Sequence, residues 1–281
     1  MGGDLMSNVT LKKFEIFKQL HNRTFVIPNP WDAGSACILK ALGYQALATT
    51  SAGYAFSKAK ADSSADISRA DILNNAKEIV DATDLPVSAD LENGFGALPD
   101  YCAETIVQSH KIGLVGGSIE DASGDKNKPI YDFNHAVERI IASCEAAREK
   151  PFLLTARAEN YLHGRLDLDD TINRLLAFEK AGADVLYAPG LPDLNAIKNV
   201  CDATTKPVNV VMGLSGPTYS VAELQEVGVK RISVGGSFAR AALGGFLRAA
   251  EEVKKLGTFT YSKDAMPVTT IMKYLKPEND C

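Results

Sequence analysis

The chain has 281 residues, of which 46% are hydrophobic and 23% charged, and its formal net charge is −5. These proportions are ordinary for a globular protein, and the acidic balance argues against nucleic acid or an anionic membrane as a partner. No apolar run approaches the roughly 18 residues that a membrane span needs. The N-terminal stretch lacks an apolar signal segment, and the five cysteines form no C-x-x-C pair, so we expect a cytoplasmic protein with reduced cysteines.

Strand and helix patterns alternate along the chain after an opening helix at residues 9–22. Eight apolar runs are predicted as strands: Thr24–Pro28, Gln45–Thr50, Pro86–Asp90, Leu114–Glu120, Phe152–Arg157, Asp184–Ala188, Pro207–Val211 and Arg231–Gly235. Helical patterns lie between and after them: Ala33–Leu42, Arg69–Ala82, Pro99–Lys111, Phe133–Glu149, Asp169–Ala181, Leu194–Ala203, Val221–Val227, Phe238–Leu256 and Met266–Tyr274.

Near-continuous apolar strands that alternate with helices indicate a parallel sheet covered on both faces. Eight such units predict a (β/α)8 TIM barrel as one domain over residues 1–281, with 258–281 as a C-terminal helical extension. The alternative is an open doubly wound sheet. That fold would favour a G-x-G-x-x-G loop after the first strand, where this chain has Asn29-Pro30-Trp31-Asp32.

Charged side chains follow the predicted strands at the ends where a barrel carries its active site. Asp90 and Glu92 end one strand, Glu120 ends the next, and Arg157 ends the one after that. Carboxylates suit a hard divalent cation such as Mg²⁺, and a guanidinium can hold a carboxylate through two hydrogen bonds. The plainer alternatives are that Asp90 and Glu92 are solvated turn residues, that Glu120 and Asp121 are a helix-capping pair, and that Arg157 pairs with Glu159 or Glu120.

Two glycine-containing segments offer backbone donors for an anion. Ser51-Ala52-Gly53 follows the second strand, where small side chains would let N–H groups approach a ligand closely, although an ordinary tight turn fits equally well. Gly235-Gly236-Ser237 follows the eighth strand and could hold a phosphate or simply permit close packing. The four histidines form no H-x-x-x-H pair, which argues against a zinc site.

The motifs together resemble the isocitrate lyase/phosphoenolpyruvate mutase superfamily over roughly Phe25 to Leu256. The matching stretches are Thr-Ser-Ala-Gly, Ala-Asp-Leu-Glu-Asn-Gly-Phe-Gly, Ile-Glu-Asp and Thr-Ala-Arg-Ala-Glu, after the second to fifth strands. The resemblance implies Mg²⁺ catalysis, with Mn²⁺ as the alternative cation, on a small carboxylate substrate. It also implies a homo-oligomer, usually a tetramer, in which subunits exchange the last helix, here Met266–Tyr274.

The resemblance assigns roles by position. Asp90, Glu92 and Glu120 are the metal residues. Asp62, Glu120 and Arg157 are the catalytic residues, with Asp62 on a mobile loop. The substrate-binding residues are Ser51, Ala52, Gly53, Arg157 and Asn209.

The loop after the fourth strand departs from two branches of this superfamily. The lyases carry a proton-donating cysteine there and the mutases a Lys-Thr-Asn-like stretch. This chain has Ser123–Pro129, which contains no cysteine and matches the mutase stretch only loosely, through Lys126-Asn127-Lys128. We therefore expect a Mg²⁺-dependent lyase that cleaves a C–C bond of a 2-oxo or hydroxy acid through an enolate, oxaloacetate decarboxylation being the best match. Phosphonate chemistry, methylisocitrate-type cleavage and a non-catalytic carboxylate- or phosphate-binding barrel are the alternatives.

Overall fold

The computed structural model describes residues 2–62 and 66–275. The last six residues of the predicted extension 258–281, Cys281 among them, lie outside these ranges. The eight strands are β1 (Phe25–Ile27), β2 (Leu47–Ala48), β3 (Val87–Asp90), β4 (Gly116–Glu120), β5 (Leu153–Arg157), β6 (Val185–Tyr187), β7 (Val208–Val211) and β8 (Arg231–Ser233).

Helices alternate with these strands along the chain. They are α1 (Gly2–Leu20), α2 (Ala33–Ala41), α3 (Ser51–Ser57), α4 (Arg69–Ala82), α5 (Pro99–Lys111), α6 (Phe133–Ala147), α7 (Leu168–Ala181), α8 (Leu194–Ala203), α9 (Val221–Glu226), α10 (Ser237–Leu256) and α11 (Val268–Leu275). Two 3₁₀ turns, η1 (Tyr161–His163) and η2 (Thr260–Lys263), complete the described elements.

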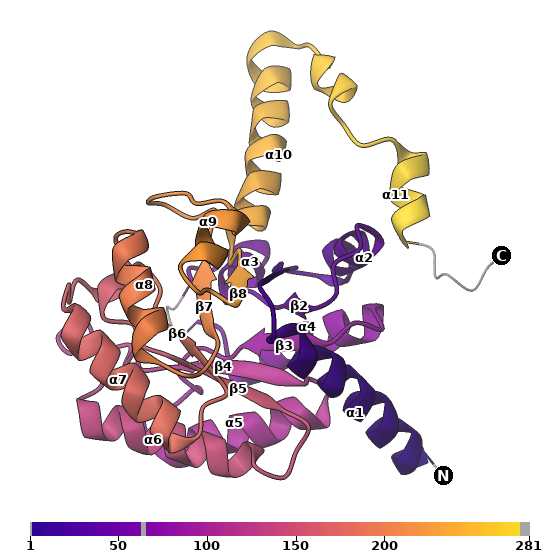
Figure 1. The fold of residues 1–281 in the computed structure, drawn as a ribbon. Coiled ribbons are helices and arrows are strands. Elements are labelled where there is room, and N and C mark those ends of the chain that lie inside the picture. Colours follow the sequence, from indigo (N-terminus) through magenta and orange to yellow (C-terminus); the bar gives the residue numbers. More distant parts are fainter. Residues whose placement is uncertain (1, 63–65, 276–281) are drawn as a thin grey trace.

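The strands form one parallel sheet that curls into a nearly closed barrel (Figure 1). The sheet order is β1-β8-β7-β6-β5-β4-β3-β2, and all seven ladders are parallel. The remaining seam lies between β1 and β2, where the Ala48 N–H donates to the Pro28 carbonyl at 3.0 Å. The predicted (β/α)8 barrel is therefore confirmed, and the open doubly wound alternative is wrong.

Each predicted strand contains an observed one, and the predicted helices agree to within a few residues except at two places. The opening helix begins at Gly2 rather than at residue 9. The segment Ser51–Ser57 is helical, although Ser51–Gly53 was expected to be a loop. Thr50 caps this helix by accepting a hydrogen bond from the Gly53 N–H at 3.2 Å. A threonine before the segment is a typical helix-start residue, but the small residues that follow it also suit a turn.

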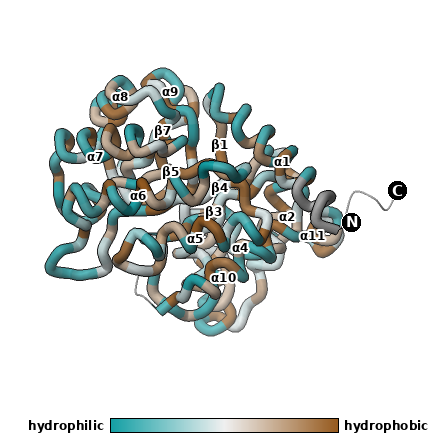
Figure 2. The backbone as a smooth tube through the Cα atoms, turned by 90° about the horizontal axis from the view of Figure 1, so that it is seen from below, coloured by the Kyte–Doolittle hydropathy of each residue, from teal (hydrophilic) through white to brown (hydrophobic). Residues whose placement is uncertain are grey.

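The lower end of the barrel is closed by α1. Phe17 and Leu20 of this helix pack with Phe25, Ile27 and other buried side chains at the amino-terminal ends of the strands. His21, just after the helix, lies between the rings of Phe17 and Phe25 with centroid distances of 4.8 and 5.1 Å. The helices around the barrel alternate hydrophilic and hydrophobic residues, as expected for elements that bury one face (Figure 2).

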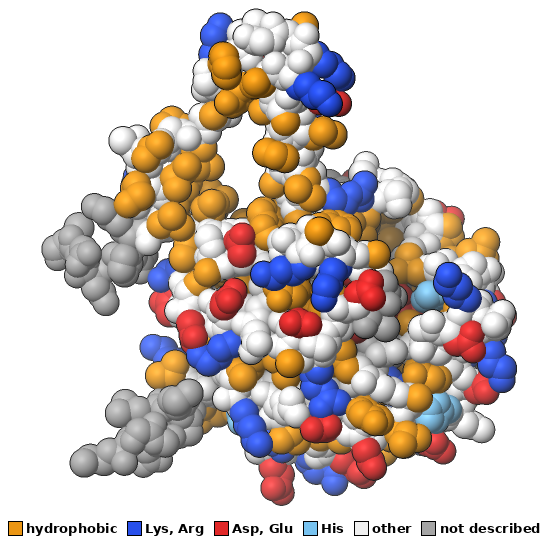
Figure 3. Space-filling model, turned by 180° about the vertical axis from the view of Figure 1, so that it is seen from behind, with side chains coloured by type: hydrophobic (Ala, Val, Ile, Leu, Met, Phe, Trp, Pro, Cys, Tyr) orange, Lys and Arg blue, Asp and Glu red, His pale blue; other side chains and the backbone are white. Residues whose placement is uncertain are grey.

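Helices α10 and α11 form a projecting arm (Figure 1). The arm rises from the end of β8, turns at η2 and returns so that α11 contacts α2 of the same chain. Apolar side chains gather on it (Figure 3), and Phe246 is 71% and Val268 72% exposed. The expected exchange of the last helix between subunits stays a prediction. None of the described helices is both long enough and apolar enough to cross a membrane.

Candidate active site

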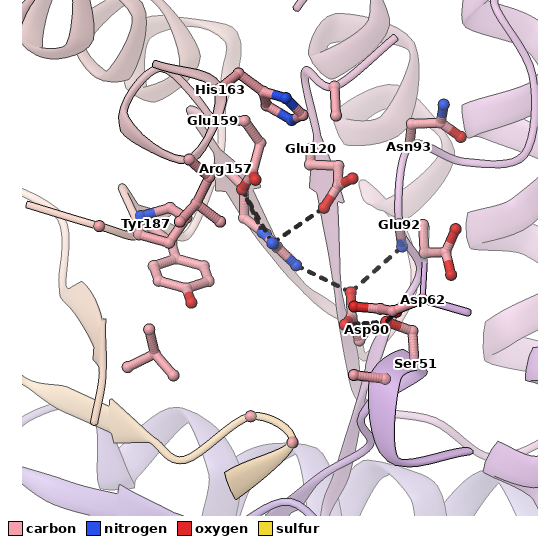
Figure 4. A pocket seen from close by; sticks show the side chains of 18 of the residues that line it. Ser51, Asp62, Asp90, Glu92, Asn93, Glu120, Arg157, Glu159, His163 and Tyr187 are labelled. Carbon is pink, nitrogen blue, oxygen red and sulfur yellow. Dashed lines mark hydrogen bonds and ion pairs between the residues drawn. The ribbon is translucent and has the colours of Figure 1, made fainter. Parts of the chain in front are cut away.

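The carboxyl ends of the strands surround a cavity of about 1290 Å³. Ser51, Asp90, Glu120 and Arg157 line it, although they come from α3, β3, β4 and β5. Their side chains gather around one open space (Figure 4). The structure thus brings together residues far apart in the sequence, at the end of the barrel where active sites of this fold are built.

Strand register explains why these side chains converge. Glu120 pairs with Arg157 across β4 and β5, and Arg157 pairs with Tyr187 across β5 and β6. Register partners in a sheet project to the same face, so all three side chains point into the barrel mouth. The same row continues through Asn209 to Arg231, one step deeper on β7 and β8.

Arg157 is the centre of the charge network at the mouth. Its guanidinium lies 3.0 Å from Asp90, 3.1 Å from Glu120 and 3.0 Å from Glu159. Burial acts to lower the pKa of Arg157, but these three carboxylates outweigh burial and raise it. The ion pairs with Glu120 and Glu159 that were the alternative interpretation are therefore both present, together with one to Asp90.

Glu92 lines the cavity but forms no ion pair with Arg157. Its carboxylate makes no hydrogen bond or ion pair with any residue of the described ranges. Burial raises its pKa to about 8, with Asp90 and Asp62 adding to the rise and Arg157 opposing it. Its backbone φ of +47° is in the left-handed region, a conformation that costs a non-glycine residue about 1 kcal/mol or more.

The loop that carries Glu92 is held from behind by Arg139 of α6. The Arg139 guanidinium donates to the carbonyls of Gly96 at 2.6 Å and Ala97 at 2.7 Å, and also to that of Asn93. It lies 4.3 Å from the Tyr131 ring and is 1% exposed. No carboxylate of the described residues pairs with it, and both of its Nη atoms donate to this loop, whereas its Nε has no hydrogen-bond partner among the described residues.

Glu120 and its neighbour Asp121 have different environments. Burial raises the pKa of Glu120; Arg157 opposes this, whereas Glu159, Asp90 and Glu92 add to it. Asp121 turns away from the mouth and accepts from Arg174 at 2.9 Å, an ion pair in which both side chains are buried. The interpretation of these acids as helix-capping residues is therefore wrong for Asp121, which is part of a buried ion pair.

The segment after β2 presents a hydroxyl and a helix terminus to the cavity. The Ser51 hydroxyl lies 3.0 Å from Asp62 and 3.0 Å from Asp90, and its single hydrogen can serve only one of them at a time. Ser51 and Ala52 line the cavity. Gly53 was expected to bind substrate, but its N–H already donates a hydrogen bond to the Thr50 side chain.

Asn209 does not lie where a substrate-binding residue was expected. It is 2% exposed inside the barrel and is not among the described residues that line the mouth cavity. Its amide oxygen accepts from Arg231 at 2.8 Å, and its amide nitrogen donates to Ser233 at 3.0 Å. Asn209 pairs in register with Tyr187, but its side chain is engaged by Arg231 and Ser233 inside the barrel and not at the mouth.

The donor set at the mouth fits a hard divalent cation held partly through water. Among the described residues, no three acidic, histidine or cysteine side chains stand close enough to ligate one ion by themselves. Asp90, Glu92 and Glu120 nevertheless offer only oxygen atoms to one cavity, and the half-buried Glu92 carboxylate has no hydrogen-bond or ion-pair partner among the described residues. Mg²⁺ keeps several waters and needs only one or two carboxylates, so these residues fit it.

Sequence reasoning missed two further groups at the mouth. Tyr187 lines the cavity, and its ring lies 5.0 Å from the Arg157 guanidinium. Burial raises its pKa, so the phenol keeps its proton at neutral pH. Its position at the end of β6 was a usable signal, whereas the role of Arg139 depends on contact between an outer helix and a distant loop.

The loop Ser123–Pro129 borders the cavity, whereas the described cysteines lie away from it. Ser123, Gly124, Asp125, Lys126 and Pro129 line the cavity. The described cysteines are free thiols within helices α2, α5, α6 and α8 and do not line it. His163 lines the mouth as an exposed residue of η1.

Comparison with known proteins shows that the chain is similar to proteins named as lyases and mutases. The sequence model for phosphoenolpyruvate phosphomutase matches residues 17–254. A Burkholderia cenocepacia J2315 protein assigned as a candidate lyase/mutase is 54% identical, with a TM-score of 0.94 over 97% of this chain and 98% of that one. A 2,3-dimethylmalate lyase structure is 26% identical, with a TM-score of 0.84 over 94% and 95%. The 2-methylisocitrate lyase of Escherichia coli K12 is 28% identical over 70% of this chain and 69% of its own.

Proposed function

Because the chain belongs to the phosphoenolpyruvate phosphomutase family, within the isocitrate lyase/phosphoenolpyruvate mutase superfamily, we propose that it is a Mg²⁺-dependent carbon–carbon lyase acting on a small 2-oxo or hydroxy carboxylic acid. Oxaloacetate decarboxylation is the reaction that its site supports best. The observation that carries this proposal is the meeting of Asp90, Glu120 and Arg157 at one cavity.

Asp90, Glu92 and Glu120 would hold the cation, directly or through water. When bound, Mg²⁺ supplies a Lewis acid that takes up negative charge developing on the substrate's oxo oxygen. With a cation held at Asp90 and Glu120, the Arg157 guanidinium would be released from these two carboxylates and could bind a substrate carboxylate. The N–H groups of Ser51 and Ala52, at the start of α3, would add donors on the same side of the cavity.

Decarboxylation then needs only an electron sink and a proton. The C3–C4 bond of oxaloacetate breaks, CO₂ leaves, and the electron pair passes into the C2–C3 bond and onto the C2 oxygen. A proton added at C3 completes pyruvate. Tyr187 is our choice of donor, because its phenol is protonated, faces the open space (Figure 4) and lies against the arginine that would hold the substrate.

With Tyr187 as the proton donor, the reaction does not need a cysteine in the loop Ser123–Pro129. A lyase that splits 2-methylisocitrate is the second candidate, supported by the sequence relation to the E. coli enzyme. It would have to obtain its proton in the same way. Phosphonate chemistry stays an alternative, and a barrel that binds a carboxylate without turnover is the alternative of a different class.

A substrate screen tests the proposal. Oxaloacetate, 2-methylisocitrate, 2,3-dimethylmalate and phosphonopyruvate are each incubated with the full chain, with Mg²⁺ or with EDTA, and the products are followed by NMR. We expect Mg²⁺-dependent formation of pyruvate and CO₂ from oxaloacetate above the rate with Mg²⁺ alone. Ligand-induced thermal stabilisation without any product would instead indicate the non-catalytic barrel.

We also propose that the protein is a cytoplasmic homo-oligomer, a tetramer in which the α10–α11 arm is exchanged between subunits. The support is the apolar surface of this arm, which includes the exposed Phe246, Leu247 and Val268. Such an apolar surface on a projecting element is typical of an interaction site. Light scattering should give about four times the 30.1 kDa chain mass. A monomeric mass would overturn the assembly without affecting the proposed chemistry.

A further inference from the structure

A second, smaller cavity lies inside the barrel next to the active-site cavity. Its volume is about 70 Å³, several times the roughly 10–15 Å³ that one water molecule needs. Asp90, Arg157 and Tyr187 line both cavities, so the inner chamber adjoins the active site. Its other polar lining comes from residues that point into the barrel, among them Thr49, Ser88, Asn209, Arg231 and Ser233.

Arg231 brings an uncompensated charge to this chamber. Its side chain donates to Asn209 at 2.8 Å and to Thr155 at 2.9 Å, both neutral groups, and it forms no ion pair with any carboxylate of the described residues. One guanidinium nitrogen, Nη1, is buried without a hydrogen-bond partner. Arg231 is 6% exposed. A buried charge left unpaired is costly, so this environment requires a compensating group.

The guanidinium is charged under ordinary conditions. Burial lowers the pKa of Arg231 to about 10, which still leaves it protonated at neutral pH. His21, at the amino-terminal end of the barrel, adds no second positive charge near Arg231 at neutral pH. Burial, and then repulsion by Arg231, lowers the pKa of His21 to about 3, so the imidazole is neutral.

The chamber offers hydrogen-bond donors to a ligand. Thr49 Oγ1 already accepts from the Asp90 N–H at 3.0 Å, and Ser233 Oγ accepts from Asn209 at 3.0 Å, so each hydroxyl hydrogen is free to donate. The Asn29 amide oxygen is also occupied, because it accepts from two backbone N–H groups at 2.9 and 3.0 Å.

Asp90 is the carboxylate on the chamber lining, and its negative charge does not make the chamber a cation site. Its oxygens already accept from Arg157 at 3.0 Å and from Ser51 at 3.0 Å. Arg157 neutralises its charge on the active-site side. A cation placed in the chamber would meet the Arg231 charge and the free hydroxyl hydrogens, whereas an anion would satisfy both.

We propose that the chamber is a binding site for a small monovalent anion of halide size, held by Arg231 and by the hydroxyls of Thr49 and Ser233. The site is distinct from the metal and carboxylate positions at the mouth and does not depend on the reaction proposed above. Chloride is the common ion of this class. Bound there, it would give Arg231 the counter-charge that the described residues do not supply.

Bromide is the probe for a direct test. Crystals of the full chain are soaked in sodium bromide, and anomalous differences are measured at the bromine edge. We expect a peak inside the chamber next to Arg231, and no such peak in Arg231→Met. Density in the chamber that carries no bromine signal would mean water only and would overturn the proposal, as would a bromide peak that persists in Arg231→Met.

A solution measurement checks the site without a crystal. The melting temperature is followed as sodium chloride replaces sodium methanesulfonate at constant ionic strength, because methanesulfonate is the larger anion. At a chloride concentration ten times the Kd, the folded-to-unfolded ratio should rise about elevenfold. Arg231→Met should lose this response and Arg23→Met, which removes an exposed guanidinium, should keep it.

Loss of folding would not leave the question open. Arg231→Met removes a costly buried charge and loses only the hydrogen bonds to Asn209 and Thr155, so this variant is expected to fold. If it does not, the bromide experiment on the unaltered protein still decides. A chloride response of equal size in the wild type and in Arg231→Met would contradict the proposal.

Discussion

Asp90 and Arg157 are 67 positions apart in the chain, yet their side chains form an ion pair of 3.0 Å at the barrel mouth. The pair joins the residue expected to hold the metal with the residue expected to hold the substrate. Either ligand would therefore change the environment of the other. A cation that binds Asp90 releases this carboxylate from Arg157, and the freed Arg157 guanidinium can then bind a substrate carboxylate. We therefore expect the cation and the substrate to favour each other's binding.

Removing the Asp90 charge should abolish metal-dependent turnover. We expect Asp90→Asn to lower kcat with oxaloacetate by at least about 10²-fold, because electrostatic stabilisation of developing charge typically contributes that much or more. Asp90→Ala should have the same effect. The control is Asp100→Asn, an exposed acid in the first turn of α5. Wild-type-like turnover of Asp90→Ala in the presence of EDTA would rule out the metal role.

Arg157→Lys should separate substrate binding from folding. Lysine keeps the charge but cannot form a two-pronged contact with a carboxylate. We expect KM for oxaloacetate to rise by about tenfold or more, with a smaller fall in kcat, in steady-state assays. Arg23→Lys, an exposed position at the far end of the barrel, is the matched control. An unchanged KM would show that Arg157 serves only to pair the three carboxylates.

Arg139 is predicted to act on the metal through the backbone of the Asn93–Ala97 loop. Groups behind metal ligands typically change metal affinity by about 10–100-fold when removed. We expect Arg139→Met to weaken Mn²⁺ binding, measured by electron paramagnetic resonance, within that range. Arg148→Met, at the exposed end of the same helix, should bind Mn²⁺ as the wild type does. If Arg139→Met melts earlier but keeps its Mn²⁺ affinity, the residue is structural only.

His21 should make the protein less stable in mild acid. The imidazole is buried, its Nδ1 lies 2.8 Å from the Phe17 carbonyl, and its pKa falls from 6.5 to about 3 on folding. The unfolded chain therefore binds the extra proton between these values, and stability falls as the pH drops below 6.5. At pH 5 the loss from this group is about 2 kcal/mol.

The measurement is the free energy of unfolding by urea at pH 7 and pH 5. His21→Leu should lose about 2 kcal/mol less than the wild type over this interval, whereas His135→Gln, a half-buried position on α6, should follow the wild type. An equal pH response in His21→Leu and the wild type would show that His21 is not responsible.

The parts of the site that lie on strand ends could be predicted, because the chain order of apolar runs determines which residues meet at a barrel mouth. Asp90, Glu120 and Arg157 were found in this way. The chain order of the strands does not predict how deep in the barrel a side chain lies. Asn209 belongs to the same register row but lies one layer lower, which depends on strand tilt. The chain order also does not predict the partners of Arg157, because the sequence leaves open whether its guanidinium binds a substrate or pairs with acids of the same chain.

Contacts between elements far apart in the chain are the other part that sequence did not reveal. Arg139 is one polar residue on an amphipathic helix, and nothing in its neighbourhood indicates that its guanidinium reaches the carbonyls behind Glu92. The helix Ser51–Ser57 was missed for a local reason. Its small residues favour a turn as readily as a helix, and the cap at Thr50 decides between them.

The central claim is that Asp90, Glu92 and Glu120 hold one divalent cation beside a carboxylate bound by Arg157. The most direct test is a crystal structure of the full chain with Mn²⁺ and oxalate, with anomalous data collected at the manganese edge. We predict one manganese peak among the three carboxylates, with an oxalate carboxylate in contact with the Arg157 guanidinium. A manganese peak elsewhere, or an Arg157 that keeps all three ion pairs while oxalate binds at another place, would contradict the account.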